Sequence, residues 1–159
     1  MKKEKFFLSI LLLAIIDQVL KLIVILYKNS LPIEIIKNFL EIVYCENKGA
    51  AFSIGSGSTT VITIITAIMM TLILWAIYKY YSKFSKVILM GSAFLISGGI
   101  GNLLDRAFRH YVVDFIYFKV IDFPIFNFAD ICVVIGVIVI CLGLVIGDRG
   151  EKVDKNNSK

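Results

Sequence analysis

Four long apolar runs are the feature that most limits the folds open to this sequence, at residues 6–26, 60–78, 87–104 and 130–147. A helix needs about 20 apolar residues to cross the roughly 30 Å of hydrocarbon in a bilayer, and each run is near that length. Hydrophobic residues make up 58% of the chain, whereas soluble domains are about 45–50% apolar. We therefore predict an all-α membrane protein, a single integral domain over residues 1–159 with four transmembrane helices and a disordered polar tail at 148–159.

Basic residues indicate the direction of the predicted helices. They precede the first run, separate the second run from the third, and follow the fourth: Lys2, Lys3 and Lys5, then Lys79, Lys83 and Lys86, then Arg149, Lys152, Lys155 and Lys159. Because cytoplasmic loops carry an excess of Lys and Arg, both termini should face the cytoplasm, and the loops near 27–59 and 105–130 should face outward. This distribution accounts for the net charge of +5, so we expect no nucleic-acid partner.

The first outer loop is predicted to contain a small β-rich region. Residues 31–36 and 39–44 are rich in β-branched and aromatic side chains, which favours short strands on the membrane surface. The chain then reads Asn47-Lys-Gly-Ala-Ala-Phe-Ser. Small residues such as Gly49 let a backbone approach a substrate or a neighbouring helix closely. Packing is the better interpretation of this motif in isolation, although the amide of Asn47 is also suited to holding a substrate carbonyl.

Two charges interrupt the first apolar run. Asp17 and Lys21 are four residues apart, so they share one face of a helix. Charges within a membrane span are expected to pair, and we favour a structural ion pair over a catalytic Ser–Lys dyad, since no serine is singled out as a partner. The same charges also allow a different function, a small four-helix transporter or exporter.

Two aspartates of the second outer loop form the candidate catalytic pair. Asp114 lies in a strand-like apolar segment, and Asp130 lies at the mouth of the fourth run, after the turn expected at Pro124. Their spacing lets the loop fold back and bring both carboxylates together. Taken singly, Asp130 would be a helix cap and Asp114 a solvated loop residue. As a pair that shares one proton, they fit an aspartic protease.

Other catalytic machineries fit the sequence less well. Neither a GxSxG nor an HExxH motif is present. His110 is the single histidine and is expected on the surface of a loop, so we predict no metal site. The segment Gly98-Gly-Ile-Gly-Asn-Leu-Leu-Asp-Arg is no nucleotide loop, since its glycines lie within a membrane run and suit close helix packing. No cofactor is expected.

Two polar residues near the outer end of the third run are further candidates. Asn102 and Arg106 are four residues apart. The rigid and permanently charged fork of Arg106 is suited to orienting a carboxylate or a substrate carbonyl. An ordinary solvated pair between Asp105 and Arg106 is the alternative interpretation.

Taken together, these residues make the sequence resemble a known family, the bacterial lipoprotein signal peptidases, also called signal peptidase II. The resemblance covers nearly the whole chain and rests on five ordered motifs: Asp17-Gln18 with Lys21, Asn47-Lys-Gly-Ala-Ala-Phe, Gly98-Gly-Ile-Gly-Asn-Leu-Leu-Asp-Arg, Val112-Val-Asp-Phe, and Phe123-Pro-Ile-Phe-Asn-Phe-Ala-Asp. Any single motif would be a weak signal, but five in this order are specific.

The resemblance implies that Asp114 and Asp130 are the catalytic aspartates. It also implies a set of substrate-binding or dyad-supporting residues: Asn47, Gly49, Asn102, Arg106, Asn127 and Ala129. The expected substrate is a prolipoprotein whose cysteine carries a diacylglyceryl group, cleaved just before that cysteine, with globomycin as an expected inhibitor. The enzyme would be a monomer among the lipids of the bacterial cytoplasmic membrane, with its active site near the outer face.

Overall fold

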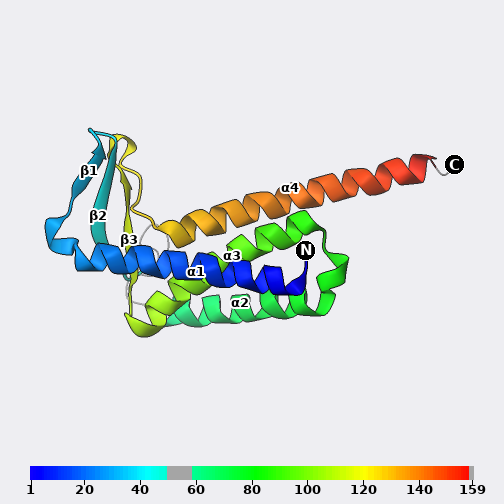
Figure 1. The fold of residues 1–159 in the computed structure, drawn as a ribbon, viewed down its shortest axis with the longest axis horizontal. Coiled ribbons are helices and arrows are strands. Elements are labelled where there is room, and N and C mark those ends of the chain that lie inside the picture. Colours follow the sequence, from blue (N-terminus) through cyan, green and yellow to red (C-terminus); the bar gives the residue numbers. More distant parts are fainter. Residues whose placement is uncertain (50–58, 158–159) are drawn as a thin grey trace.

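In the computed structural model of the chain, four long helices lie along one another and a small sheet stands at one end of them (Figure 1). The structure describes residues 1–49 and 59–157. The last residues of the motif that begins at Asn47 therefore lie outside the described residues. The N-terminus and the last turn of α4 both lie toward the end of the molecule that is away from the sheet.

The four predicted helices are confirmed: α1 spans Lys3–Leu26, α2 Thr59–Tyr80, α3 Lys86–Phe108 and α4 Phe128–Asn157. Ser85 caps the start of α3, where its hydroxyl accepts a hydrogen bond from the backbone N–H of Ile88 at 3.2 Å. This helix continues one turn past its predicted end at Leu104. Asp105 and Arg106 consequently lie on the helix and not in a loop.

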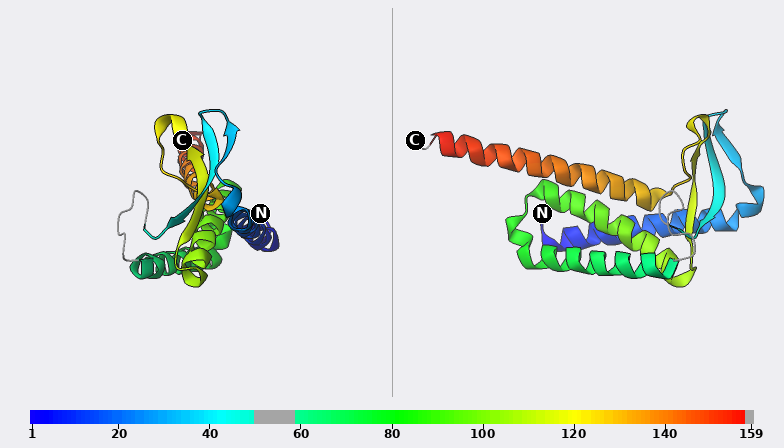
Figure 2. Two further views of the ribbon diagram at one scale, coloured as in Figure 1. Left: turned by 90° about the vertical axis from the view of Figure 1, so that its left-hand side faces the viewer. Right: turned by 180° about the vertical axis from the view of Figure 1, so that it is seen from behind.

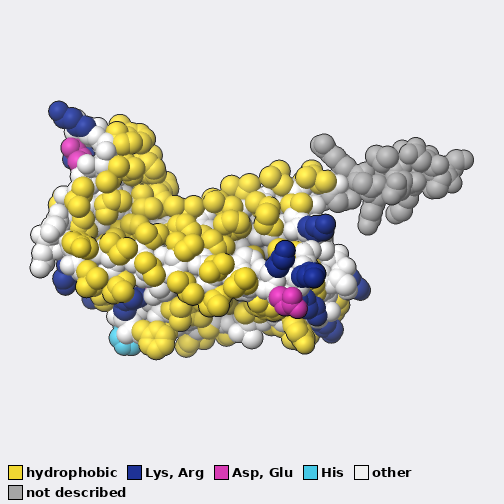
Figure 3. Space-filling view, in the orientation of Figure 1, with side chains coloured by type: hydrophobic (Ala, Val, Ile, Leu, Met, Phe, Trp, Pro, Cys, Tyr) yellow, Lys and Arg dark blue, Asp and Glu magenta, His cyan; other side chains and the backbone are white. Residues whose placement is uncertain are grey.

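The outward faces of the helices are apolar. Large exposed side chains include Leu11, Ile68, Leu72 and Ile138, and soluble proteins rarely expose so much contiguous apolar surface. The described residues contain four helices long and apolar enough to span a membrane. Figure 3 shows apolar side chains over the middle of the molecule and a group of Lys and Arg side chains near the N-terminus. The chain is a multi-pass membrane protein.

The fourth helix is longer than the sequence predicted. It continues to Asn157, through most of the polar segment for which we expected a disordered tail. Adding residues to a helix that is already nucleated fixes few dihedral angles for each hydrogen bond gained, so a polar segment without proline can extend the end of a membrane helix.

The predicted β-rich region is a three-stranded antiparallel sheet in the order β1-β2-β3 (Figure 2). Its strands are β1 (Ile33–Ile36), β2 (Leu40–Asn47) and β3 (Val112–Phe118), and short 3-10 turns follow α1 at Lys28–Ser30, α2 at Tyr81–Lys83 and β3 at Lys119–Ile121. The register places Cys45 of β2 opposite Asp114 of β3. The sheet thus joins the first outer loop to the segment that carries one of the two candidate aspartates.

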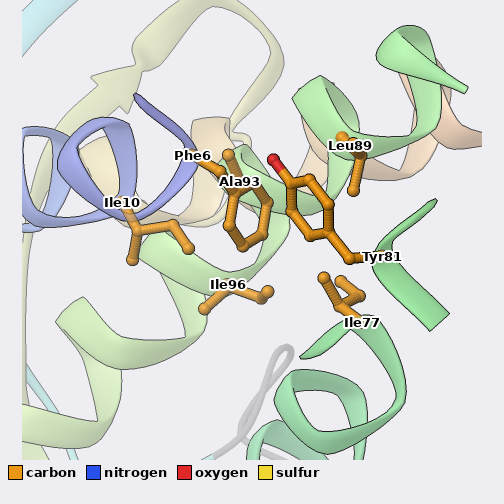
Figure 4. Close-up of a cluster of buried hydrophobic side chains, with 7 residues drawn as sticks. All are labelled: Phe6, Ile10, Ile77, Tyr81, Leu89, Ala93 and Ile96. Carbon is orange, nitrogen blue, oxygen red and sulfur yellow. The ribbon is translucent and has the colours of Figure 1, made fainter. Parts of the chain in front are cut away.

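Two kinds of packing contact hold the helices together. Away from the sheet, α1, α2 and α3 share a buried apolar cluster (Figure 4): Phe6, Ile10, Ile77, Tyr81, Leu89, Ala93 and Ile96. Along their length α3 and α4 approach closely at glycines, since a Cβ on Gly91 would lie 2.8 Å from the carbonyl oxygen of Gly136. A Cβ on Gly98 would likewise overlap the carbonyl oxygen of Ala129, so the close packing of α3 and α4 continues to the first turn of α4.

Candidate active site

A cavity of about 950 Å³ opens where the sheet meets the last turns of α3 and the first turns of α4. Its apolar wall includes Ile131, Val134 and Ile135 of α4. Its polar lining residues are Glu46, Asn47, Lys48, Asn102, Arg106, Asp114, Tyr117, Asp122 and Asp130. Both candidate catalytic aspartates therefore line the same cavity, although they come from different elements.

Asp114 is held from two sides by amide groups. One oxygen accepts a hydrogen bond from the Asn47 side-chain amide at 2.9 Å, and the other accepts one from the Asn127 amide at 2.6 Å. The residue is buried, at 2% exposure. Because a carboxylate oxygen has two lone pairs, each oxygen keeps one acceptor position beyond these amides.

The environment of Asp114 raises its pKa to about 6. Burial is the largest cause, because it disfavours the ionised carboxylate. The hydrogen bond from Asn47 opposes this effect, and the negative charge of Asp130 adds to it. A carboxyl group with this pKa changes its protonation state close to neutral pH, which is the property expected of a group in acid–base catalysis.

Asp130 lies in the first turn of α4 and forms a reciprocal cap with Asn127, the residue before the helix. The side-chain oxygen of Asn127 accepts from the Asp130 backbone N–H at 3.0 Å, and the Asp130 carboxylate accepts from the Asn127 backbone N–H at 3.1 Å. The other carboxylate oxygen accepts from the Asn102 amide at 2.8 Å. The cap predicted for Asp130 alone is therefore present, and the same side chain also lines the cavity.

Asn127 connects the two candidate aspartates. Its side-chain amide donates to Asp114, and its backbone N–H donates to Asp130. The same amide nitrogen also donates to the side-chain oxygen of Asn102 at 3.1 Å. Asn127 is fully buried, so its position is set by packing and by these bonds together. The loop between β3 and α4 has folded back, as the spacing predicted.

Arg106 reaches across the cavity toward the first outer loop. Its guanidinium donates to the carbonyl oxygen of Gly49 at 3.3 Å and to that of Asn102 at 3.4 Å. Its Nε is buried and has no hydrogen-bond partner among the described residues. Gly49 is itself positioned by a bond of 2.9 Å from its N–H to the Asn47 side chain. The alternative of a solvated Asp105–Arg106 pair is wrong, because Asp105 is fully buried and pairs with Lys21 and Arg109.

Ala129 does not line the cavity. It is fully buried, and a Cβ added to Gly98 of α3 would overlap its carbonyl oxygen. Its backbone N–H donates to Asp17 at 3.0 Å. Among the predicted site residues, Ala129 thus packs between α3 and α1 and does not line the cavity.

Asp17 and Lys21 form the predicted ion pair, with 2.8 Å between Lys21 Nζ and the carboxylate. Lys21 Nζ also lies 3.0 Å from a carboxylate oxygen of Asp105. The sequence reasoning missed Asp105, which is fully buried and also pairs with Arg109. The sequence held one signal, the spacing of four residues between Gly101 and Asp105, which places both on one face of a helix. In the structure that face of α3 meets α1, since a Cβ on Gly101 would lie 2.5 Å from Asp17.

Comparisons with known proteins agree on one family. Residues 9–146 match the family model described as Signal peptidase (SPase) II. The chain is 42% identical over 135 residues to a lipoprotein signal peptidase of Clostridium acetobutylicum, covering 83% of this chain and 84% of the relative. It is 36% identical over 146 residues to the lipoprotein signal peptidase of Fusobacterium nucleatum, covering 90% of this chain and 87% of the relative.

Solved structures give the same result for the fold. A bacterial membrane enzyme solved by the in meso method at 2.3 Å resolution superposes with a TM-score of 0.78 at 32% identity, covering 99% of this chain and 93% of that one. A second bacterial membrane enzyme, solved at 1.9 Å, gives a TM-score of 0.75 at 33% identity, covering 89% and 93%. With a family model that matches residues 9–146 and relatives this similar over most of their length, the chain belongs to the signal peptidase II family and is a membrane protease.

Proposed function

We propose that this protein removes signal peptides from diacylglyceryl-modified prolipoproteins as an aspartic endopeptidase, cutting just before the lipidated cysteine. The observation that carries this proposal is the convergence of Asp114 and Asp130 on one cavity, linked through Asn127. The lipoprotein signal peptidases among its relatives support the substrate class. No metal or organic cofactor enters the proposed reaction.

In the proposed mechanism the two aspartates share one proton. The ionised aspartate takes a proton from a water molecule, whose oxygen attacks the carbonyl carbon of the scissile peptide. The protonated aspartate gives its proton to the carbonyl oxygen, which yields a tetrahedral diol. The diol then collapses and the C–N bond breaks. The leaving nitrogen takes the proton that the first aspartate accepted from water, a diol hydroxyl returns a proton to the other aspartate, and the carboxyl group of the signal peptide is released. Because water is the nucleophile, no serine or cysteine is required.

Neutral and cationic donors around the cavity are suited to holding the substrate backbone. Arg106 offers a buried Nε without a partner among the described residues, and we assign it to a substrate carbonyl. Its charge also lies near both carboxylates. Asn47 and Asn102 hold Asp114 and Asp130 respectively, so they support the dyad.

The wall of the cavity suits a substrate anchored in lipid. Ile131, Val134 and Ile135 continue the cavity down the first turns of α4, within a helix that spans the membrane. A diacylglyceryl chain on the cysteine would lie along such an apolar wall and place the scissile bond at headgroup depth. The Lys and Arg side chains at the opposite end of the molecule support a cytoplasmic location for that end. We accordingly assign the cavity to the outer face of the bacterial cytoplasmic membrane and propose that the enzyme acts as a monomer.

The test is cleavage of a diacylated prolipoprotein by the purified protein. Asp114→Asn and Asp130→Asn should each lower kcat by about 10²–10⁴-fold, because each removes one acid–base group. Glu4→Gln is the matched control: it neutralises an exposed carboxylate on the first turn of α1, far from the cavity, and should cleave like the wild type. Globomycin should inhibit the wild type.

Two results would reject the proposal. One is a wild-type protein that leaves the diacylated prolipoprotein intact. The other is a folded Asp114→Asn or Asp130→Asn variant with full activity. The transporter alternative was based on Asp17 and Lys21 within a membrane span. Nothing now favours it, because these two residues are buried against each other and are not among the described residues that line the cavity.

A further inference from the structure

Three charged side chains lie directly behind the candidate dyad and do not line its cavity. Asp17, Lys21 and Asp105 are each at most 1% exposed. Lys21 Nζ lies 2.8 Å from Asp17 and 3.0 Å from Asp105. If close packing of α1 against α3 were their only role, apolar side chains of similar volume would serve it as well or better. Their contacts with the backbone indicate what else they do.

Each of the two carboxylates holds the backbone immediately before a candidate catalytic aspartate. Asp105 accepts the N–H of Val113, the residue before Asp114, at 3.1 Å. Asp17 accepts the N–H of Ala129, the residue before Asp130, at 3.0 Å. Hydrogen bonds to a buried carboxylate are stronger than bonds between neutral groups. The dyad aspartates come from two different elements, and each is fixed at its base in the same way.

Lys21 connects the two carboxylates that hold the backbone and also bonds to Asn102. It contacts both carboxylates, and it also donates to the side-chain oxygen of Asn102 at 2.9 Å. That bond fixes which end of the amide faces Asp130, since the nitrogen of Asn102 is then the atom that donates to the carboxylate at 2.8 Å. One buried ammonium therefore connects α1 to the residues that position both aspartates.

We propose that Asp17, Lys21 and Asp105 are positioning residues that set the separation and orientation of the two catalytic carboxylates. The inference rests on the proposed function of Asp114 and Asp130. A misplacement of about 1 Å can lower the rate about 10²-fold, which is the scale of effect expected when one backbone attachment is lost.

The pH dependence of the reaction should report the separation of the carboxylates. The charged and titratable groups that face Asp114 are Asp130 on α4, Lys21 on α1, Arg106 on α3 and Cys45 on β2. Repulsion between two close carboxylates raises the pH at which the shared proton is lost. If Asp114 moves away from Asp130, the repulsion weakens and the basic limb of the kcat profile moves to lower pH.

The comparison of Asp105→Asn with Asp105→Ala isolates the hydrogen bond from the Val113 N–H to residue 105. Both substitutions remove the same negative charge, but only asparagine keeps an oxygen that can accept the Val113 N–H. The asparagine oxygen is expected to stay toward Val113 and the fully buried Lys21, because Arg109 on the other side is 26% exposed and can move away. Glu41→Ala is the matched control, since it deletes another carboxylate with little exposure, one that is paired with Lys119 at 2.6 Å outside the cavity.

We expect Asp105→Ala to lower kcat on diacylated prolipoprotein about 10²-fold, with KM within about threefold of wild type. Its basic limb should lie at lower pH than that of Asp105→Asn, which should keep at least about a tenth of the wild-type kcat. Glu41→Ala should stay within about twofold. Should Asp105→Ala fail to fold, Asp105→Ser takes its place, because serine is too short to reach Val113.

Amide hydrogen exchange at Val113 gives a readout that does not depend on catalysis. Exchange should be faster in the alanine or serine variant than in wild type and Asp105→Asn. The positioning role would be overturned if Asp105→Asn and Asp105→Ala (or Asp105→Ser) had equal kcat values and equal exchange at Val113. It would also be overturned if Asp105→Ala changed KM and left kcat at the wild-type value. A wild type that fails to cleave would instead reject the proposed function, and the exchange data would still decide the role of Asp105.

Discussion

Asp114 should make the stability of this protein depend on pH. Its pKa in the folded protein is raised to about 6 from an ordinary value of 3.8. The folded form therefore binds this proton more tightly than the unfolded form. The contribution to the free energy of unfolding is fully present below about pH 4 and is lost as the pH rises through about 6. Above that pH the protein keeps a buried negative charge that it would be more stable without.

The size of this effect follows from the shift in pKa. From 3.8 to about 6 is roughly 2 units, and each unit corresponds to about 1.4 kcal/mol. Wild-type protein should lose about 3 kcal/mol of unfolding free energy across this range, and somewhat less if the unfolded chain already shields the group. For a chain of this length that corresponds to about 6–12 °C in Tm.

The assay compares wild type with Asp114→Asn in thermal unfolding from pH 4 to pH 7.5. The asparagine cannot ionise, so the difference in Tm between the two proteins should change in favour of the variant as the pH rises. The amide of the variant also faces the donors of Asn47 and Asn127, but that cost is the same at every pH. Only the slope of the difference is therefore interpreted.

Removing a hydrogen bond gives a second arm of the same experiment. The Asn47 bond lowers the pKa of Asp114, so Asn47→Ala should shift the window of pH-dependent stability to higher pH. Parallel Tm curves for wild type and Asp114→Asn over the whole range would show that burial of this carboxylate costs nothing, and the reasoning would be refuted.

Two further predictions concern the supports of Asp130. Gly98→Val should destabilise the protein by about 1–3 kcal/mol and lower kcat, because its side chain would collide with the Ala129 backbone; an unchanged Tm would contradict this. Asn127→Ala should lose both the cap of α4, worth about 1 kcal/mol, and the donor to Asp114. Asn127→Ser keeps a capping oxygen but no amide, so it should recover Tm without recovering kcat, and recovery of both would contradict the assigned role.

The parts of the fold that the sequence predicted correctly are those set by local composition. Apolar length predicted the four helices, and β-branched content predicted strands on either side of Asn38. Spacing along the chain also predicted that Asp17 and Lys21 pair, since residues four apart meet on a helix. Each of these inferences needs only the neighbours of a residue within one element.

The supports of the site were not predictable in this way. Asp105 reads as a loop residue next to an arginine, but its partners are Lys21 on α1 and Val113 on β3. Ala129 reads as a small residue in a motif, but its role is a backbone N–H directed at α1. Such contacts depend on how α1, α3 and β3 pack together, and the periodicity of a single segment does not predict that packing.

The choice of amides around the carboxylates has a physical reason. Three asparagine nitrogens donate to Asp114 or Asp130, and each amide is oriented by a separate bond to its oxygen. Those oxygens accept from the Gly49 N–H, from the Lys21 ammonium and from the Asp130 N–H. Ammonium groups in the same positions would favour two ionised carboxylates and expel the shared proton that the proposed mechanism requires. Neutral donors hold both acids in place and still let one of them stay protonated, which is the state that a water-activating pair of aspartates requires.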